Sequence, residues 1–116
     1  MTPRERMEHV FRGEPVDCIP RVPILMQYAA EYIGSDYGRF AADHRVLVEA
    51  NLRCAKDFGF DQLSCISDPY RETQGFGGDV TYVTDGPPRC THPLESDRDL
   101  SALKQPDPMN SERMRD

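Results

Sequence analysis

Residues 43–69 decide the fold of this chain, and they read DHRVLVEANLRCAKDFGFDQLSCISDP. Asp43 is a favoured helix N-cap, and apolar side chains then recur at intervals of three and four residues, as they do along one face of a helix. Those apolar residues are Leu47, Ala50, Cys54 and Phe58. Gly59 ends the predicted helix, because glycine readily adopts the left-handed conformation that closes helices. Residues 60–67 follow as a predicted buried strand.

A strand is also predicted before this helix, over residues 21–26, where the sequence is apolar and β-branched. Pro20 and Pro23 lack the N–H group that a sheet needs, so they place the start of this strand at the margin of a sheet. The order strand, helix, strand predicts two parallel strands joined by a right-handed crossover. Parallel sheets need covered faces and edges, and the sequence predicts no other elements that cover them. We therefore expect the opening segment of a larger α/β enzyme.

The remaining predicted elements follow local signals. Thr2 and Glu5 form a capping-box pattern that predicts a helix over residues 3–12. The others are a helix over 28–33, a helix from Pro69 to Phe76, a β-hairpin of residues 80–83 and 89–92, a short helix begun by Ser96 with Asp99, and a helix from about Asn110. We assign residues 1–108 to one part of a domain and residues 109–116 to the start of its next helix.

The composition excludes several classes of protein. The chain is 38% hydrophobic and 29% charged, with a net charge of −6, so it suits a globular protein and offers no basic stripe for nucleic acid. No apolar run is long enough to cross a membrane, and residues 1–6 lack the apolar core of a secretory signal, which predicts a cytoplasmic protein. The four cysteines form no Cys-x-x-Cys pair, so neither a zinc knuckle nor a redox motif is predicted, and we expect reduced cysteines that fill core positions.

An ordered series of motifs runs through almost the whole chain. It comprises Met1 to Arg6, Arg12 to Asp17, Pro20 to Pro23, Phe58 to Asp61, Ser67-Asp68, Asp85 to Pro88, His92 to Ser96, and Leu103 to Pro108. In order and spacing this series resembles the N-terminal segment of the uroporphyrinogen decarboxylase-like (URO-D-like) superfamily. The resemblance implies the N-terminal part of a (β/α)₈ TIM barrel, with a β-hairpin insertion after the second strand and an active site at the carboxyl ends of the strands.

The resemblance also separates two branches of this superfamily. Haem-pathway decarboxylases carry Met-Arg-Gln-Ala-Gly-Arg-Tyr after the first strand, and its two arginines face substrate carboxylates. Residues 26–32 read MQYAAEY, so Gln27 and Glu31 stand at the arginine positions and the charge-assisted binding of carboxylates is lost. We therefore favour a corrinoid/thiol methyltransferase, inactive as this segment alone. The alternatives are a uroporphyrinogen decarboxylase of porphyrin biosynthesis and a non-catalytic module that self-associates through exposed strand edges.

Candidate site residues gather where the two predicted strands end. The resemblance makes Asp68 the counterpart of the decarboxylase aspartate that gathers pyrrole N–H groups, and we assign it a catalytic role. Alternatively, an aspartate before proline caps the helix that follows. Polar residues that could face a pocket and bind substrate are Gln27, Tyr28, Tyr70, Arg71 and Glu72. Their alternative interpretation is a solvated loop.

The methyltransferase branch implies a zinc ion bound by a His-x-Cys pair and a further cysteine. This chain has no His-x-Cys, and we interpret His9, His44 and His92 as structural or solvated. We therefore predict no metal or cofactor within this segment; zinc and a corrinoid belong to a full-length relative, with zinc ligands beyond Asp116. The expected partner is a small-molecule substrate or a corrinoid protein.

Overall fold

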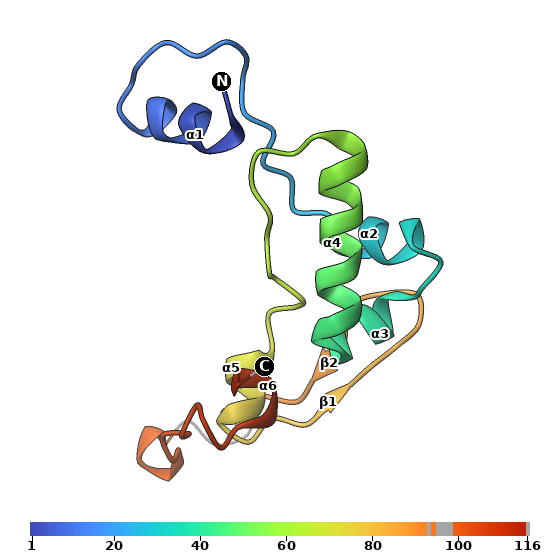
Figure 1. The fold of residues 1–116 in the computed structure, drawn as a ribbon. Helices are drawn as coiled ribbons and strands as arrows, with labels where there is room; N and C mark the ends of the chain where they lie inside the picture. The colour runs from blue at the N-terminus through green and yellow to red at the C-terminus, as the bar shows by residue number, and fades with distance from the viewer. Residues whose placement is uncertain (93, 95–98, 116) are drawn as a thin grey trace.

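The computed structural model describes residues 1–92, 94 and 99–115, and this part of the chain is mostly helical. Its helices are α1 (Pro3–Phe11), α2 (Gln27–Tyr32), α3 (Tyr37–Ala42), α4 (His44–Phe58), α5 (Arg71–Gly75), the 3₁₀ helix η1 (Leu100–Ala102) and α6 (Glu112–Arg115). Two strands, β1 (Val80–Thr81) and β2 (Arg89–Cys90), complete it. Figure 1 shows α1 apart from the other helices, with α2 and α3 beside α4. Within the described residues no helix is long and apolar enough to span a membrane.

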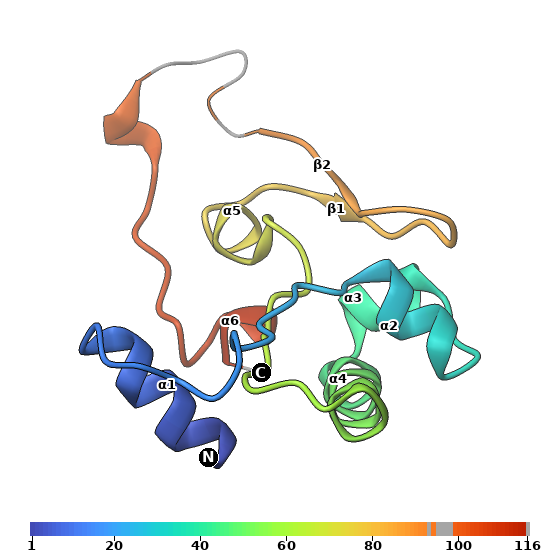
Figure 2. The same ribbon diagram turned by 90° about the horizontal axis from the view of Figure 1, so that it is seen from above.

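The hydrophobic core lies between α2, α3 and α4. Its buried residues are Ala29, Ala30, Tyr37, Phe40, Ala41, Leu47, Ala50 and Cys54. Several of them are alanines, whose small side chains let neighbouring helices approach closely. Phe40 is the largest of the fully buried side chains, at 1% exposure, and its ring meets that of Tyr37 edge-on with centroids 5.9 Å apart. The core therefore belongs to a helical layer, seen end-on along α4 in Figure 2.

The predicted helices at 3–12, 28–33 and 43–58 are confirmed within a residue or two. The capping box at α1 is present, because the Thr2 side chain accepts from Glu5 N–H at 3.3 Å and the Glu5 carboxylate accepts from Thr2 N–H at 2.8 Å. At α4 the Asp43 carboxylate accepts from Arg45 N–H at 2.9 Å, and Gly59 ends the helix with a φ of +65°. Local capping chemistry thus fixes both helices.

Helix α3 is an element that the sequence analysis missed. Asp36 caps it by accepting from Arg39 N–H at 2.8 Å, and Tyr37, Phe40 and Ala41 are buried. Their spacing of three and four residues is a helical signal, but it spans less than two turns and merges with the cap of α4. The last predicted short helix appears as η1, where Asp99 accepts from Ser101 N–H; Ser96 lies outside the described residues.

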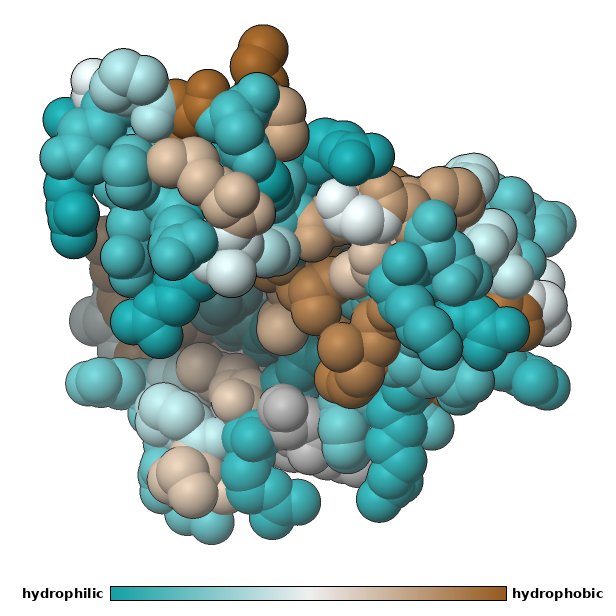
Figure 3. Space-filling view, turned by 45° about the horizontal axis from the view of Figure 1, so that its top comes forward, coloured by the Kyte–Doolittle hydropathy of each residue, from teal (hydrophilic) through white to brown (hydrophobic). Residues whose placement is uncertain are grey.

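The two predicted parallel strands are wrong for this structure. Residues 21–26 and 60–67 are extended but form no ladder, and the backbone hydrogen bond between them runs from Asp61 N–H to the Arg21 carbonyl at 2.9 Å. A strand needs a neighbour to accept and donate, and Pro23 can donate nothing. The apolar side chains are correspondingly exposed: Ile24 is 61% and Ile66 48% accessible. In the space-filling view of Figure 3, hydrophobic side chains gather near the centre of the visible face between hydrophilic flanks.

The predicted β-hairpin is confirmed in a shorter form. Strands β1 and β2 are antiparallel, with Val80 opposite Cys90 and Thr81 opposite Arg89, and they make the sheet of the described residues. The loop between them reaches α3, where Tyr37 N–H donates to the Thr84 carbonyl at 3.2 Å. The hairpin is thereby attached to the start of α3 and to the helical layer.

Candidate functional site

The candidate site lies where the second extended segment ends and α5 begins. Ser67 and Asp68 precede α5 and are both buried, at 0% and 6% exposure. Helix α6 packs against α5, beside which it lies in Figure 1, and its Arg113 side chain contacts both Asp68 and Gln74. The site thus joins residues that are 45 positions apart in the sequence.

Asp68 is a fully enclosed carboxylate with a complete set of partners. One oxygen, Oδ1, accepts from Tyr70 N–H at 2.9 Å. The other, Oδ2, accepts from the Ser67 hydroxyl at 2.8 Å and from the Arg113 guanidinium. A buried charge needs such pairing to offset its loss of hydration. The bond from Tyr70 N–H is the local turn contact that the capping interpretation predicts, while the ion pair with Arg113 is tertiary.

Arg113 connects α6 to three other parts of the molecule. Besides Asp68, its guanidinium donates to the Gln74 side-chain oxygen on α5 and to the Ala41 carbonyl at the end of α3, each at 3.2 Å. The guanidinium carbon also lies 5.3 Å from the centroid of the Tyr82 ring, within the range of a cation–π contact. Its Nε atom is buried and has no hydrogen-bond partner among the described residues.

Arg71 contributes a second guanidinium to the site. Its Nε donates to the Ser67 hydroxyl at 2.9 Å, and its NH1 donates to the Arg113 backbone carbonyl. Within the described residues, no carboxylate lies within ion-pair distance of Arg71. Among the side chains that the structure describes, the site therefore holds the guanidinium groups of Arg71 and Arg113 and the carboxylate of Asp68.

The charge of Asp68 reaches two further side chains. Burial raises the pKa of the Tyr37 phenol, and the negative charge of Asp68 raises it further. Burial also raises the pKa of the Cys90 thiol, with smaller contributions in the same direction from Asp79 and Asp68. Both groups are kept protonated at neutral pH, so neither is an activated nucleophile.

The structure divides the site residues predicted from sequence into two groups. Asp68, Tyr70 and Arg71 are together, and the Tyr70 ring lies 6.3 Å from that of His92. Glu72 follows on α5 but lines a separate cavity of about 290 Å³ with Phe76 and His92. The prediction missed Arg113, since its partner Asp68 is too distant in sequence for any local pattern to connect them.

Gln27 and Tyr28 lie on α2, within the helical layer and away from this cluster. The Gln27 amide donates to the Glu31 carboxylate at 2.8 Å, and the Tyr28 ring stacks on that of Tyr32 with centroids 6.0 Å apart. Both predicted residues are exposed, and Tyr28 is 50% accessible. The residues predicted at the two strand ends therefore lie in two separate parts of the described chain.

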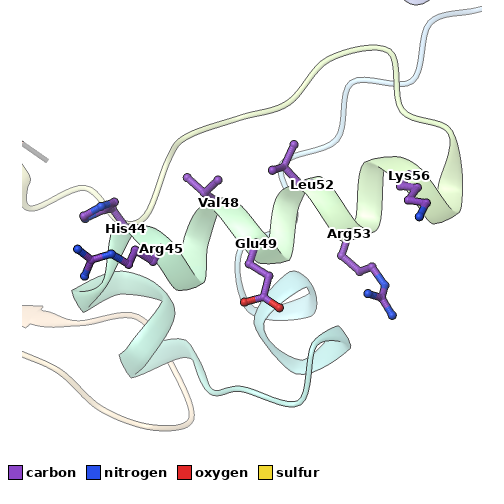
Figure 4. Close-up of a pocket in the computed structure, with 7 residues that line it drawn as sticks. All are labelled: His44, Arg45, Val48, Glu49, Leu52, Arg53 and Lys56. Carbon is purple, nitrogen blue, oxygen red and sulfur yellow. The ribbon is translucent and has the colours of Figure 1, made fainter.

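A larger hollow follows the outer face of α4, and Figure 4 shows its side chains projecting from that single helix. Val48 and Leu52 form its apolar strip, between charged residues such as Arg45 and Lys56. Because one helix supplies every lining residue, the hollow is a shallow surface and brings no reacting groups together. Among the described residues there is no cluster of three or more His, Cys, Asp or Glu that could hold a metal ion.

Comparison with known proteins assigns the chain to a family. The family model of uroporphyrinogen decarboxylase (URO-D) matches residues 2–115, so the chain belongs to that family. Members of the family have the TIM-barrel fold. Two proteins named "Uroporphyrinogen decarboxylase", from the J-10-fl and Y-400-fl strains of Chloroflexus aurantiacus, are each 31% identical to it over 114 residues. The alignment covers 90% of this chain and 31% of each relative. No solved structure matches it.

These findings reverse the preference for the methyltransferase branch over the decarboxylase branch. Both relatives carry the name of the decarboxylase, so the comparisons favour the decarboxylase alternative over the methyltransferase interpretation drawn from Gln27 and Glu31. The chain spans 31% of the length of these relatives.

Proposed function

We propose that this chain supplies the N-terminal part of a URO-D family decarboxylase, a lyase of porphyrin biosynthesis, and that Asp68 is its substrate-facing carboxylate. The observation that carries the proposal is the position of Asp68, buried at the end of the second extended segment. In TIM barrels the active site lies at the carboxyl ends of the strands. The family match and the names of the two relatives support the reaction class.

The extended segments support a barrel as the complete fold. In a barrel, residues 21–26 and 60–67 would be the first two strands, with neighbours that accept their backbone hydrogen bonds and cover their side chains. In this chain Val22 and Leu63 are 47% and 39% exposed, along with the two isoleucines described above. Apolar strand residues exposed on extended backbone are suited to pairing with further strands.

The hydrogen bonding of Asp68 fits the chemistry proposed for it. The carboxylate accepts every hydrogen bond that it makes, from one backbone N–H, one hydroxyl and one guanidinium. Accepting hydrogen bonds from the N–H groups of a pyrrole is the same type of interaction. For substrate to reach it, the Arg113 contact would have to give way, and we therefore place Arg113 at the entrance to this carboxylate.

The test is decarboxylation by the natural protein that contains this chain. Given uroporphyrinogen, it should form coproporphyrinogen, detected after oxidation by chromatography with fluorescence. Asp68→Asn should lower the rate by roughly a hundredfold or more, the scale seen when a group that stabilises a transition state is removed. Asp85→Asn, in the exposed hairpin loop, is the matched control and should leave the rate unchanged. Unimpaired decarboxylation by Asp68→Asn would contradict the role of Asp68.

A corrinoid/thiol methyltransferase is the second candidate, and the Gln27–Glu31 pair favours it. A neutral amide, Gln27, and a negative carboxylate, Glu31, stand where decarboxylases carry arginines, and the two side chains are hydrogen-bonded to each other. This candidate requires zinc and a methyl-corrinoid in the whole protein. Zinc determination by atomic absorption, with an assay of methyl transfer from methylcobalamin to a thiol, discriminates the two: metal and transfer without decarboxylation would support it.

A further inference from the structure

Ser67 is a buried serine next to Asp68 that was not among the site residues predicted from the sequence. It is 0% exposed, and its hydroxyl donates to Asp68 Oδ2 at 2.8 Å. The Ser67 oxygen accepts in turn from the Nε–H of Arg71 at 2.9 Å. Ser67 therefore lies between a guanidinium and the carboxylate of the candidate site, and it is hydrogen-bonded to both.

The direction of the Ser67 hydroxyl follows from the chemistry of its two partners. A hydroxyl has a single hydrogen to donate, and it accepts through its lone pairs. A guanidinium offers only donors, and an ionised carboxylate offers only acceptors. The Ser67 oxygen must therefore accept from Arg71 and direct its hydrogen at Asp68. Arg71 is held at its other end as well, because its NH1 donates to the Arg113 backbone carbonyl.

The hydrogen bonds to Asp68 divide between its two oxygens. Tyr70 N–H donates to Oδ1, whereas the Ser67 hydroxyl and the Arg113 guanidinium donate to Oδ2. A carboxylate has about four acceptor positions, roughly two on each oxygen. Once the Arg113 contact gives way to a substrate, Tyr70 N–H and the Ser67 hydroxyl occupy one position on each oxygen. One position on each oxygen is then free for the N–H groups of the substrate.

We propose that Ser67 is a positioning residue for Asp68, and that its hydroxyl, oriented by Arg71, holds the carboxylate in the orientation that the reaction requires. This inference rests on the proposed function, in which Asp68 faces the substrate. The groups involved lie within residues 67–71, so they stay in place when the Arg113 side chain moves away. Rotation of the carboxylate would misdirect both free acceptor positions, and misplaced groups of this kind slow catalysis.

The first test is Ser67→Ala in the natural protein that contains this chain, because alanine removes the hydroxyl and adds no bulk. We expect kcat for the decarboxylation of uroporphyrinogen to fall by roughly tenfold or more, the typical loss for a hydrogen bond to a charged group. KM should change by less than about twofold, since the lost interaction acts in the transition state. A purely structural role would reduce the amount of folded protein, measured by far-UV circular dichroism, but not kcat per folded molecule. Ser101→Ala, at an exposed position on η1, is the matched control and should leave kcat unchanged.

Arg71→Gln tests the order of the hydrogen bonds. It removes the guanidinium that orients the Ser67 hydroxyl, so it should lower kcat by less than Ser67→Ala does. Combined with Ser67→Ala it should lower kcat no further, because Arg71 acts on Asp68 through that hydroxyl. Arg39→Gln, at an exposed position on α3, is the matched control and should leave kcat unchanged. Losses that multiply in the double variant would overturn the role of Arg71.

A second measurement requires neither activity nor a folded variant of Ser67. In the unsubstituted 116-residue chain, a buried hydroxyl bonded to a carboxylate should exchange slowly and give a resolved proton resonance by NMR. Asp68→Asn should shift this resonance, and Asp85→Asn, in the exposed hairpin loop, should not. A Ser67 hydroxyl in fast exchange with water would overturn the proposal.

The two proposals fail in different ways. If the unsubstituted protein does not decarboxylate uroporphyrinogen, the proposed function fails, and the role of Ser67 in that reaction fails with it. If Asp68→Asn abolishes decarboxylation while folded Ser67→Ala retains the full kcat, the proposed function stands and the positioning role of Ser67 alone is overturned.

Discussion

Apolar side chains are buried in the helical layer of α2, α3 and α4 but exposed in the two extended segments, residues 21–26 and 60–67. In α4, Leu47 and Cys54 are 3% and 0% exposed, whereas Ile24 in the first extended segment is 61% exposed. A helix satisfies its own backbone and buries one face against a neighbour. A strand does neither until another strand pairs with it. The helices, whose backbone hydrogen bonds are local, are therefore satisfied in this chain, whereas the two extended segments have no strand to pair with among the described residues.

Polar contacts, in place of a ladder, fix the extended segments. The Asp61 carboxylate accepts from the Arg6 guanidinium of α1 and from Arg21 N–H, the latter at 2.8 Å. The Arg21 guanidinium in turn donates to the carbonyl of Phe58 at the end of α4, at 2.8 Å. These side chains attach α1 and both segments at one point. Beyond that point the second segment runs to Ser67 without backbone pairing among the described residues.

Hydrogen exchange should show the largest difference between the two regions. The amides of residues 62–65 donate to no other backbone group among the described residues, whereas those of residues 50–57 lie inside α4. We expect residues 62–65 to exchange roughly a hundredfold faster or more, because unpaired amides need no opening event. NMR or mass spectrometry in deuterated buffer measures this. Equal protection in the two regions would mean that the segments pair in solution, within the chain or with a second copy.

Deleting a core side chain should break the helical layer specifically. Leu47→Ala removes a buried side chain from α4 and should lower the free energy of unfolding by about 3 kcal/mol. Leu52→Ala is the same substitution on the same helix at a position that is 54% exposed, and it should change stability by less than about 0.5 kcal/mol. Urea denaturation followed by circular dichroism compares them. Similar losses for both variants would show that the outer face of α4 is also covered.

The same contrast explains what the sequence could predict of the fold. Asp43, Gly59 and the Thr2–Glu5 pair act through contacts within four residues, and each predicted its helix end correctly. The parallel strands failed because their pairing depends on residues far away, and Asp61 with Arg21 supplies a single backbone bond. Helix α3 was missed because its apolar pattern is shorter than two turns.

The candidate site followed the same rule. The family resemblance singled out Asp68, and Arg71 was predicted from its place in the polar stretch after residues 60–67. Arg113 was found only in the structure, because its contacts to Asp68 and Ala41 span 45 and 72 residues. An arginine at this position did not suggest a site residue either, because 29% of the residues in the chain are charged. The spacing of residues in the sequence does not predict a site that is formed by two distant segments.

Gly59 tests how far local capping determines the layer. Its φ of +65° is left-handed, and an added Cβ would meet only the Arg21 guanidinium, at an ordinary 3.5 Å. Gly59→Ala should therefore cost roughly 1–2 kcal/mol of stability from backbone strain alone. Gly86→Ala, in the hairpin loop with no left-handed φ and its nearest contact at 4.0 Å, should be close to neutral. Thermal denaturation measures both; a neutral Gly59→Ala would mean that α4 is held by packing and not by its cap.

The smallest expected effect concerns the contact that attaches α1 to the extended segments. The Arg21 N–H bond and the Arg6 guanidinium lower the pKa of the Asp61 carboxyl below its ordinary value of 3.8. The Arg6 guanidinium and the N-terminal ammonium lower that of Asp17 in the same direction. Carboxyl groups with a lowered pKa stabilise the fold fully above their ordinary pKa, and this contribution is lost as the pH falls below it.

The α1 attachment should thus be intact at pH 6 and weaken progressively below about pH 4. NMR shifts of the Arg6 Nε–H and of the α1 amides, followed from pH 6 to pH 2.5, measure it directly. Asp61→Asn retains an acceptor oxygen for Arg21 N–H but carries no charge, so α1 should be loosened already at pH 6 and respond less to acid. Asp85→Asn, in the exposed loop between β1 and β2, should titrate as the unsubstituted chain does. An unchanged acid response in Asp61→Asn would assign the attachment of α1 to packing and remove the distinction drawn between the polar junction and the helical layer.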